Sequence, residues 1–225
     1  MGDAGALPQA PPKKLFAKSF LGIFKNSYLP ERDGGKTYWR VTAKMVRLQG
    51  ERIYLAALER KDCRKLYEDF EYDFDHPAEP LYIGDSLEKS DEWFDEIQKL
   101  QGKQNVRLGI FLNDGTVIGD IALQGIDEKN RSCSVGMGMA KLESRNKGYG
   151  KQALRLLLGY GFGNLGMERI TASTLEINLS AQKSLEGSGF LLEGRERKAV
   201  YFGGKRHDRL NYGILAEEYA QPKRR

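Results

Sequence analysis

The run Arg145-Asn146-Lys147-Gly148-Tyr149-Gly150-Lys151 restricts the fold of this chain more than any other segment. It follows an apolar, strand-like stretch and opens a leucine-rich stretch with helical spacing. Its two glycines allow the backbone to bend tightly, so that unpaired N–H groups point outward from the start of a helix. These groups and the helix dipole both favour an anion. The run therefore predicts a strand-to-helix corner that binds a pyrophosphate.

The composition is typical of a globular protein, with 40% apolar and 30% charged residues in a chain of 225. No window approaches the ~20 apolar residues of a membrane span, so none is expected. Cys63 and Cys133 stand far apart, and with only two histidines they form neither a disulfide scaffold nor a metal-ligand pattern. We therefore expect a cytoplasmic protein without a metal site.

The net charge of +5 is concentrated near the N-terminus. Residues 1–45 contain eight Lys and Arg against three Asp and Glu, which leaves 28 residues of each sign beyond them. The body is therefore neutral, and a nucleic-acid partner is not expected. We predict a basic, partly disordered leader at 1–45, a folded domain at 46–217 and a short basic tail at 218–225. Within the leader, Lys13–Tyr28 reads either as a short amphipathic helix for a membrane or protein partner, or as a flexible segment that docks weakly.

Periodicity in the domain predicts alternating strands and helices. The strands are expected at Val46–Leu58, Arg107–Leu112, Thr116–Ile126, Ser132–Ala140, Arg169–Leu175, Gly189–Phe202 and Arg206–Leu215. The helices are expected at Asp62–Phe70, at Ser90–Leu100 with Ser86 as N-cap, after Gly148 as far as Phe162, and at Ala181–Glu186. Asn113-Asp114-Gly115 predicts a tight hairpin.

The segment Gly161–Gly166 fits G-x-G-x-x-G, the fingerprint of a dinucleotide site. That fingerprint must follow a strand and open a helix. This copy stands at the end of the predicted helix and before a strand, so we expect it to terminate the helix instead.

A second motif joins the glycine run. Asn178 is followed eleven and twelve residues later by Gly189-Phe190, and Gly194–Lys198 and Gly203–Leu210 complete the pattern. Together with Arg-x-x-Gly-x-Gly, these residues resemble the GNAT family of N-acetyltransferases, in its Rim-type branch. That branch includes acetyltransferases of ribosomal-protein N-termini, polyamines and amino sugars.

The resemblance implies an α+β fold: a mixed, mostly antiparallel sheet of six or seven strands, flanked by four helices. Two central strands splay apart after a bulge, and the pantetheine arm of the donor lies between them. Gly136 and Gly138 are compatible with a bulge or a close backbone approach in one of these strands.

The resemblance also implies acetyl-CoA as acetyl donor and assigns its contacts. The pyrophosphate would bind the loop residues Arg145, Asn146, Lys147, Gly148, Tyr149, Gly150 and Lys151. Backbone N–H groups at Met139, Ala140 and Lys141 would hold the thioester end. Asn178 would bond the pantetheine arm, although Asn178 also suits a helix cap.

An amine would then attack the thioester directly in a ternary complex, and the site must remove a proton from the ammonium. Three family positions depart from the pattern, since Ser134 stands in place of a glutamate, Leu185 in place of a tyrosine and Ala181 in place of a serine. The remaining candidates are Asp120, Ser134 through a water chain, and the turn residues Asp127 and Glu128 as base. Ser180 or Ser184 would protonate the leaving thiolate.

These departures leave two functions open. One is an N-acetyltransferase for a primary amine, such as a peptide N-terminus, a polyamine or an amino sugar. The other is a CoA-binding sensor or partner-binding module without turnover. Acidic residues interleaved with aromatics in 68–80 suit a cationic acceptor, but they also suit a solvated loop. A homodimer is possible, and the sequence does not decide it.

Overall fold

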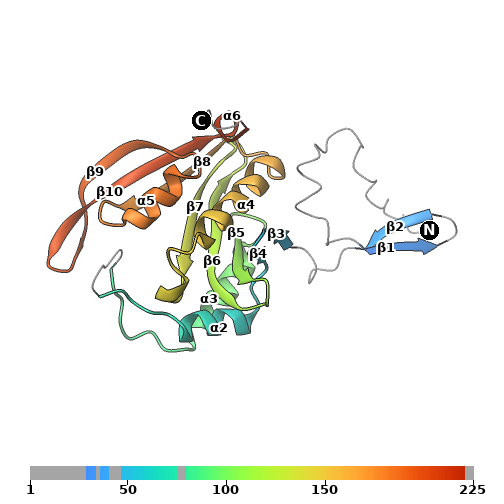
Figure 1. Ribbon diagram of the computed structural model, residues 1–225, viewed down its shortest axis with the longest axis horizontal. Coiled ribbons are helices and arrows are strands. Elements are labelled where there is room, and N and C mark those ends of the chain that lie inside the picture. Colours follow the sequence, from blue (N-terminus) through green and yellow to red (C-terminus); the bar gives the residue numbers. More distant parts are fainter. Residues whose placement is uncertain (1–28, 34–35, 41–46, 75–79, 221–225) are drawn as a thin grey trace, which may run out of the picture.

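The computed structural model describes residues 29–33, 36–40, 47–74 and 80–220 (Figure 1). Its strands are β1 (Leu29–Asp33), β2 (Lys36–Arg40), β3 (Arg47–Gln49), β4 (Ile53–Ala56), β5 (Val106–Leu112), β6 (Val117–Asp127), β7 (Ser132–Met139), β8 (Arg169–Leu175), β9 (Leu191–Phe202) and β10 (Lys205–Leu215). Its helices are α2 (Arg60–Glu68), α3 (Lys89–Leu100), α4 (Tyr149–Gly163), α5 (Leu179–Glu186), α6 (Ala216–Ala220) and the 3-10 helix η2 (Leu142–Ser144).

The leader is described only in part. Its predicted amphipathic segment, Lys13–Tyr28, lies outside the described residues. Strands β1 and β2 form a separate two-stranded antiparallel sheet, which the sequence reasoning did not anticipate. The proposed boundaries of leader, domain and tail stay predictions.

The main sheet has the strand order β3-β4-β5-β6-β7-β8-β10-β9. Every neighbouring pair is antiparallel except β7 and β8, which are parallel. Connections such as the hairpin at Asn113-Asp114-Gly115 are as predicted, and Gly115 has the positive φ of +94° that such a turn requires. The mixed, mostly antiparallel fold expected from the sequence is confirmed.

The described sheet has eight strands rather than six or seven, because the strand predicted at Val46–Leu58 is two short strands, β3 and β4. The chain reverses after Gly50, whose N–H donates a 2.9 Å hydrogen bond to the carbonyl oxygen of Ile53. A Cβ on Gly50 would stand 2.8 Å from that oxygen, so only glycine fits the reversal without a shift. The described α-helices also exceed the predicted four by one, the short α6.

Strands β7 and β8 separate soon after they meet. Their pairing covers only Ser132–Ser134 against Arg169–Thr171. The remainder of each strand has no partner on that side, which confirms the expected splay. The nearby irregularity lies in β6 between Gln124 and Asp127, whereas Gly136 and Gly138 keep regular register with β6.

Two hydrophobic clusters cover the opposite faces of the sheet. Adjacent residues of a strand point to opposite faces, and Val117 and Ile118 of β6 accordingly belong to different clusters. One cluster contains Leu154 and Leu157 of α4, and the other contains Cys63 of α2. Each fully buried leucine contributes about 1.5–3 kcal/mol to folding. These clusters fix α4 on one face and α2 with α3 on the other (Figure 1).

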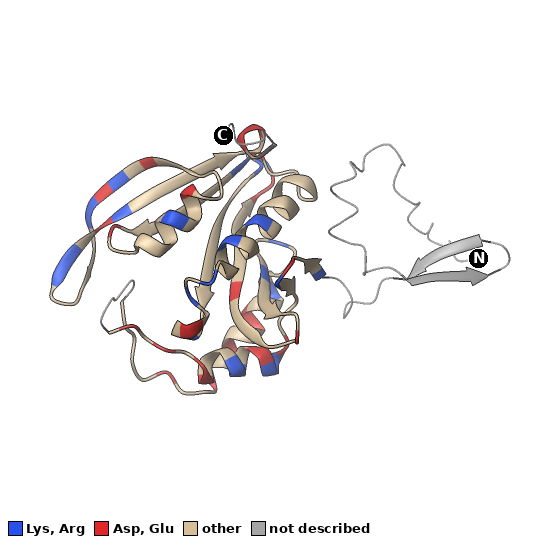
Figure 2. Ribbon diagram, in the orientation of Figure 1, with Lys and Arg blue, Asp and Glu red and all other residues tan. Residues whose placement is uncertain are grey.

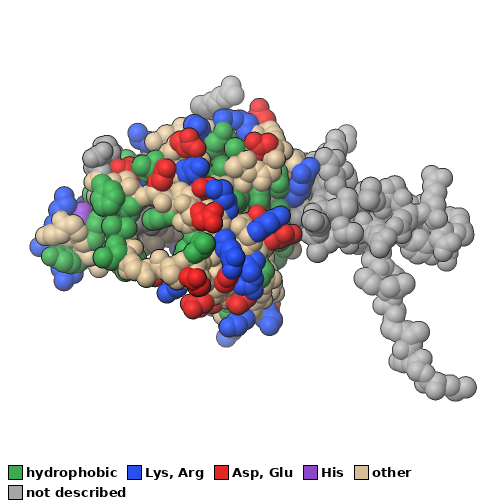
Figure 3. Space-filling model, turned by 90° about the horizontal axis from the view of Figure 1, so that it is seen from below, with side chains coloured by type: hydrophobic (Ala, Val, Ile, Leu, Met, Phe, Trp, Pro, Cys, Tyr) green, Lys and Arg blue, Asp and Glu red, His purple; other side chains and the backbone are tan. Residues whose placement is uncertain are grey.

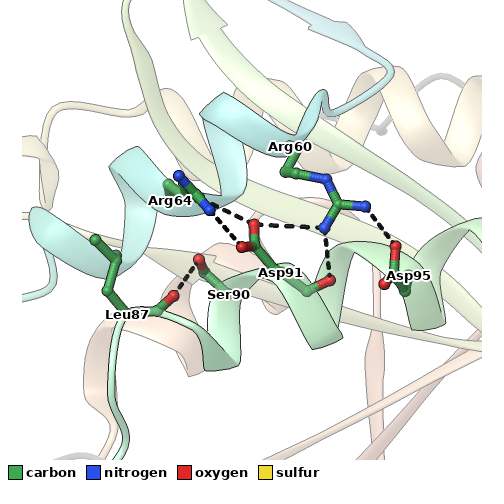
Figure 4. A network of polar contacts seen from close by, with 6 residues as sticks. All are labelled: Arg60, Arg64, Leu87, Ser90, Asp91 and Asp95. Atoms are coloured by element: carbon green, nitrogen blue, oxygen red, sulfur yellow. Dashed lines mark hydrogen bonds and ion pairs between the residues drawn. The ribbon is translucent and has the colours of Figure 1, made fainter.

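Ion pairs join α2 to α3 across that second face (Figure 4). Arg64 Nη2 lies 2.5 Å from Asp91 Oδ2, and Arg60 Nη2 lies 2.6 Å from Asp95 Oδ1.

The N-cap of α3 is Glu88 rather than the predicted Ser86. The chain first turns through residues 86–88, where the N–H of Lys89 donates to the carbonyl oxygen of Ser86.

The G-x-G-x-x-G segment ends a helix, as predicted. Helix α4 stops at Gly163, and Gly166 adopts a positive φ of +66° before β8 begins. A Cβ on Gly161 would meet Ile170 Cδ1 at 2.9 Å, so this glycine allows α4 to pack closely on the sheet. The segment therefore has no open helix N-terminus for a dinucleotide.

Candidate functional site

The glycine run forms the corner between β7 and α4. Gly148 is the N-cap of α4 with φ of +82°, and Asn146 also has a positive φ of +58°. The first bond of the helix runs from the N–H of Gln152 to the carbonyl oxygen of Gly148, at 3.1 Å. Within the described part of the chain, the N–H groups of 146–151 donate to no protein acceptor. A row of free donors at a helix N-terminus is a suitable anion site.

The turn between β3 and β4 braces this corner. Arg52 donates from Nη1 to the carbonyl oxygen of Lys147 at 3.0 Å and from Nη2 to the hydroxyl of Tyr149 at 3.1 Å. Its guanidinium carbon also stands 4.6 Å from the centre of the Tyr149 ring. Gln152 completes the brace, because its Oε1 accepts the N–H groups of Arg52 and Ile53, each at 3.1 Å. The sequence reasoning missed both Arg52 and Gln152.

The other side of the corner contacts α5. Ser180 donates from its hydroxyl to Asn146 Oδ1 at 3.1 Å. Asn178 is the N-cap of α5, and its Oδ1 accepts the N–H of Ala181 at 3.0 Å. The capping role considered for Asn178 is therefore present, and Asn178 is also a lining residue of the cavity described next.

A cavity of about 440 Å³ opens where β7 and β8 separate. Most of its lining residues are of apolar types, joined by several with hydroxyl or amide groups: Pro80, Tyr82, Val135, Gly136, Met137, Leu154, Ala172, Ser173, Thr174, Leu175, Asn178, Ala181, Ser184, Leu185, Val200 and Arg209. The view from below in Figure 3 shows the molecule hollowed between the β9–β10 side and the body. The cavity adjoins the glycine corner, because a Cβ on Gly150 would stand 2.9 Å from Cε of the lining residue Met137.

The three predicted catalytic residues do not meet. Ser184 lines the cavity. Ser134 lies where β7 and β8 still pair, and its hydroxyl donates to the carbonyl oxygen of Gln124 at 3.3 Å. Asp120 is outside the lining and is held in an ion pair with Arg107. Burial raises the pKa of Asp120, although Arg107 opposes that shift.

The predicted thioester contacts lie beyond the cavity wall, which β7 forms with residues 135–137. Ala140 donates its N–H to the carbonyl oxygen of Ile118 at 3.0 Å, so that donor is already engaged. Lys141 Nζ lies 3.6 Å from Asp69 Oδ1. Met139 pairs with Gly119 in the sheet. None of these three residues is among the lining residues of the cavity.

The charged side chains of the loop differ in whether they already contact other parts of the protein. Arg145 reaches back to the carbonyl oxygen of Glu71, at 3.4 Å from Nη2. The side chain of Lys151 lies against Gly187 at the C-terminal end of α5, because a Cβ added to Gly187 would stand 3.1 Å from Lys151 Nζ. Lys147 holds the loop through its carbonyl oxygen and has an exposed side chain. Of the three, Lys147 best fits a contact with a phosphate.

Among the described lining residues there is no aspartate, glutamate or histidine. The titratable side chains there are Tyr82, which is 81% exposed, and Arg209. The described residues also hold no cluster of three or more metal-ligating side chains. No helix in the described ranges is long and apolar enough to cross a membrane.

Comparisons with known proteins point to one family. The sequence model of the acetyltransferase (GNAT) domain matches residues 52–191. The protein named "Putative ribosomal N-acetyltransferase YdaF" from Bacillus subtilis is 29% identical over 177 residues, which is 75% of this chain and 94% of that protein. The "Probable N-acetyltransferase YjcK" of the same organism is 29% identical over 180 residues, 75% of this chain and 96% of that one.

Solved structures show the same fold. A chimera of spermidine N-acetyltransferase SpeG from Vibrio cholerae and hSSAT gives a TM-score of 0.67 at 22% identity, and the match covers 76% of this chain and all of that one (100%). RimJ of Mycobacterium smegmatis in complex with CoA-disulfide gives a TM-score of 0.67 at 21% identity, over 75% of this chain and 84% of that one.

Proposed function

The chain belongs to the GNAT acetyltransferase family, and from this premise we propose that it transfers an acetyl group to a primary amine bound at the splayed strands. It is an acetyltransferase that uses acetyl-CoA and acts on an amine. The proposal adds where the substrates bind: the pyrophosphate at the N-terminus of α4, the pantetheine arm in the cavity, and the amine at the thioester end. We further propose that the protein resides in a reducing cytoplasm, because both cysteines are free and buried.

One observation supports this arrangement most directly. The ladder between β7 and β8 ends after three residue pairs, and a cavity of about 440 Å³ begins there, beside the free N–H groups at the start of α4. A pyrophosphate at the corner would therefore have an adjoining channel for its attached arm. Acetyl-CoA supplies an activated acyl group, and the protein supplies position and donors.

The charge of the amine decides what the site must do. Deprotonation at pH 7 costs about 4.6 kcal/mol for a lysine-like amine with a pKa near ~10.4. For an α-amino group with a pKa near ~8 the cost is about 1.4 kcal/mol. The described lining offers no carboxylate or imidazole to take up the proton. We therefore propose that water accepts it, and that an α-amino group is the favoured acceptor. Ser184 is the lining hydroxyl that we assign to protonate the leaving thiolate.

The alternative of a CoA-binding module without turnover is set aside. Membership of the family and the N-acetyltransferase relatives indicate an enzyme.

The test combines binding and turnover. Calorimetry with acetyl-CoA is compared for wild type and for Gly148→Asp, which adds a carboxylate among the donors. Gly115→Asp is the matched control, since Gly115 also has a positive φ and open space around it but lies in the β5–β6 hairpin. We expect Gly148→Asp to abolish binding and thiol release over a panel of amines, and Gly115→Asp to retain both. Retained affinity in Gly148→Asp would place the pyrophosphate elsewhere.

A further inference from the structure

The β9–β10 hairpin extends beyond the sheet (Figure 1). Strand β10 pairs with β8 only over Arg209–Leu215, so Lys205–Asp208 and the facing end of β9 project past the last residue of β8. Strand β9 is the edge of the sheet and is exposed along most of its length. The free end of this hairpin is therefore open to a partner on several sides.

Charge is divided sharply along the hairpin (Figure 2). Each acidic residue of β9 and β10 is paired with an arginine: Glu193 with Arg169, Glu196 with Arg209, and Asp208 with Arg195. The four cations nearest the tip are exposed and have no carboxylate partner among the described residues. This tip cluster consists of Arg197, Lys198, Lys205 and Arg206.

Contacts at a bulge in β9 hold part of the cluster in place. Lys198 adopts a positive φ of +55°, which is uncommon for a residue with a side chain, at an irregularity in the pairing of β9 with β10. Its N–H donates to Asp208 Oδ1 at 2.7 Å, and its carbonyl oxygen accepts from Arg206 Nη1 at 3.3 Å. Arg206 also lies over the ring of Tyr201, at 5.8 Å from its centre. Two of the four cations are thus fixed to the same bulge.

The β9–β10 hairpin connects the tip cluster to the cavity. Val200 of β9 and Arg209 of β10 line the cavity, and the tip cations lie two to four residues from them along the same two strands. A strand rises about 3.3 Å per residue, so Lys205 lies about 13 Å along β10 from Arg209. An extended peptide covers that distance in about four residues.

We propose that the tip cluster recognises acceptor polypeptides with acidic side chains within about five residues of the N-terminal amine. This rests on the proposed function, in which the pantetheine arm lies in the cavity and the amine binds at the thioester end of that arm. A polyamine would be repelled by the four cations. A nucleic acid offers negative charge but no aliphatic primary amine, so charge and amine together favour an acidic peptide.

Peptide substrates of one length test the proposal with the full chain. Each begins with the same residue, and residues 2–5 are Glu, Gln or Lys. We expect kcat/KM with acetyl-CoA to fall about tenfold from the Glu to the Gln peptide and again to the Lys peptide at low salt, since several weak exposed pairs act together. The ratio of kcat/KM between the Glu peptide and the Lys peptide should approach one near 0.5 M NaCl, because salt screens exposed charges.

Charge reversal supplies the decisive comparison. The double variant Lys205→Glu, Arg206→Glu should prefer the Lys peptide, with the order of the three peptides inverted. The control is Lys103→Glu, Lys129→Glu, which changes the net charge equally at exposed positions away from the hairpin. It should keep the wild-type order.

The outcomes separate the two proposals. Absence of thiol release with every peptide and every small amine would overturn the proposed function. Turnover that is indifferent to residues 2–5, or an equal inversion in the control, would overturn only the role of the tip cluster. If the tip variant instead lost salt-dependent retention of poly(U) RNA while its peptide order stayed unchanged, the surface would be a nucleic-acid site and this inference would be wrong.

Discussion

Arg52 Nη1 lies 3.0 Å from the carbonyl oxygen of Lys147, so the turn between the first two strands of the main sheet holds the loop that precedes α4. The two residues are 95 positions apart. The contact fixes the backbone just before Gly148, where the free N–H groups converge. Donor binding therefore depends on a segment far from the glycine run in sequence.

Arg52→Ala tests this dependence. Loss of both hydrogen bonds and of the Tyr149 contact should raise KM for acetyl-CoA about tenfold, equivalent to about 1.4 kcal/mol, and leave kcat within about twofold. Arg47→Ala is the matched control, because Arg47 stacks on Tyr54 in the same hairpin at 4.9 Å and touches no loop residue in the described contacts. Arg52→Lys should restore part of the affinity, since lysine can make one of the two hydrogen bonds. A lower kcat with unchanged KM would contradict the positioning role.

Much of the corner was predictable because its signals are local. The order of an apolar strand, two glycines and leucines at helical spacing predicts the start of α4, and Asn113-Asp114-Gly115 predicts its hairpin. The splay follows from the family resemblance. These features depend on residues close in sequence or on a recognised motif.

Features that depend on distant contacts were not predictable. The brace of Arg52 and Gln152 joins residues 100 positions apart. The pairing of Asp120 with Arg107 depends on the register of β5 and β6, and it removes a carboxylate that the sequence offered as a base. The reversal at Gly50 lies in the polar stretch Gln49–Arg52, and the apolar residues on either side of that stretch were taken together as one strand. For the brace and for the ion pair, the deciding partner lies on another element of the fold.

Asn178 has two roles that one pair of variants can separate. Asn178→Ala removes the cap of α5 and should lower the free energy of unfolding by about 1 kcal/mol. Asn178→Asp keeps an oxygen for the N–H of Ala181 but loses the amide donor. We expect Asn178→Asp to retain wild-type stability in urea unfolding and to bind acetyl-CoA several-fold more weakly. Equal affinity in wild type and Asn178→Asp would show that Asn178 is a cap alone.

The thiols of the two cysteines should be unreactive in the folded protein. Burial raises the pKa of the Cys63 thiol to about 12 and that of Cys133 to about 11, so both are neutral thiols at pH 8. We expect no reaction with a thiol reagent in native buffer and two equivalents in guanidinium. The variant Cys133→Ala should keep wild-type kcat and KM. Rapid native labelling at pH 8 would contradict the burial of these side chains.

Asp208 links acid stability to the hairpin tip. The N–H of Lys198 and the guanidinium of Arg195 hold the pKa of Asp208 below its usual range. Because the folded-state pKa is the lower one, this carboxylate stabilises the fold above the unfolded pKa of about 3.9, and the contribution is lost as pH falls through the folded value. The difference in unfolding free energy between wild type and Asp208→Asn should therefore be largest at pH 6 and shrink below pH 4. Glu128→Gln, in the exposed β6–β7 turn, is the control and should show a smaller change over the same range. A difference that stays constant from pH 6 to pH 2.5 would mean that the charge of Asp208 does not contribute to the stability of the bulge at Lys198.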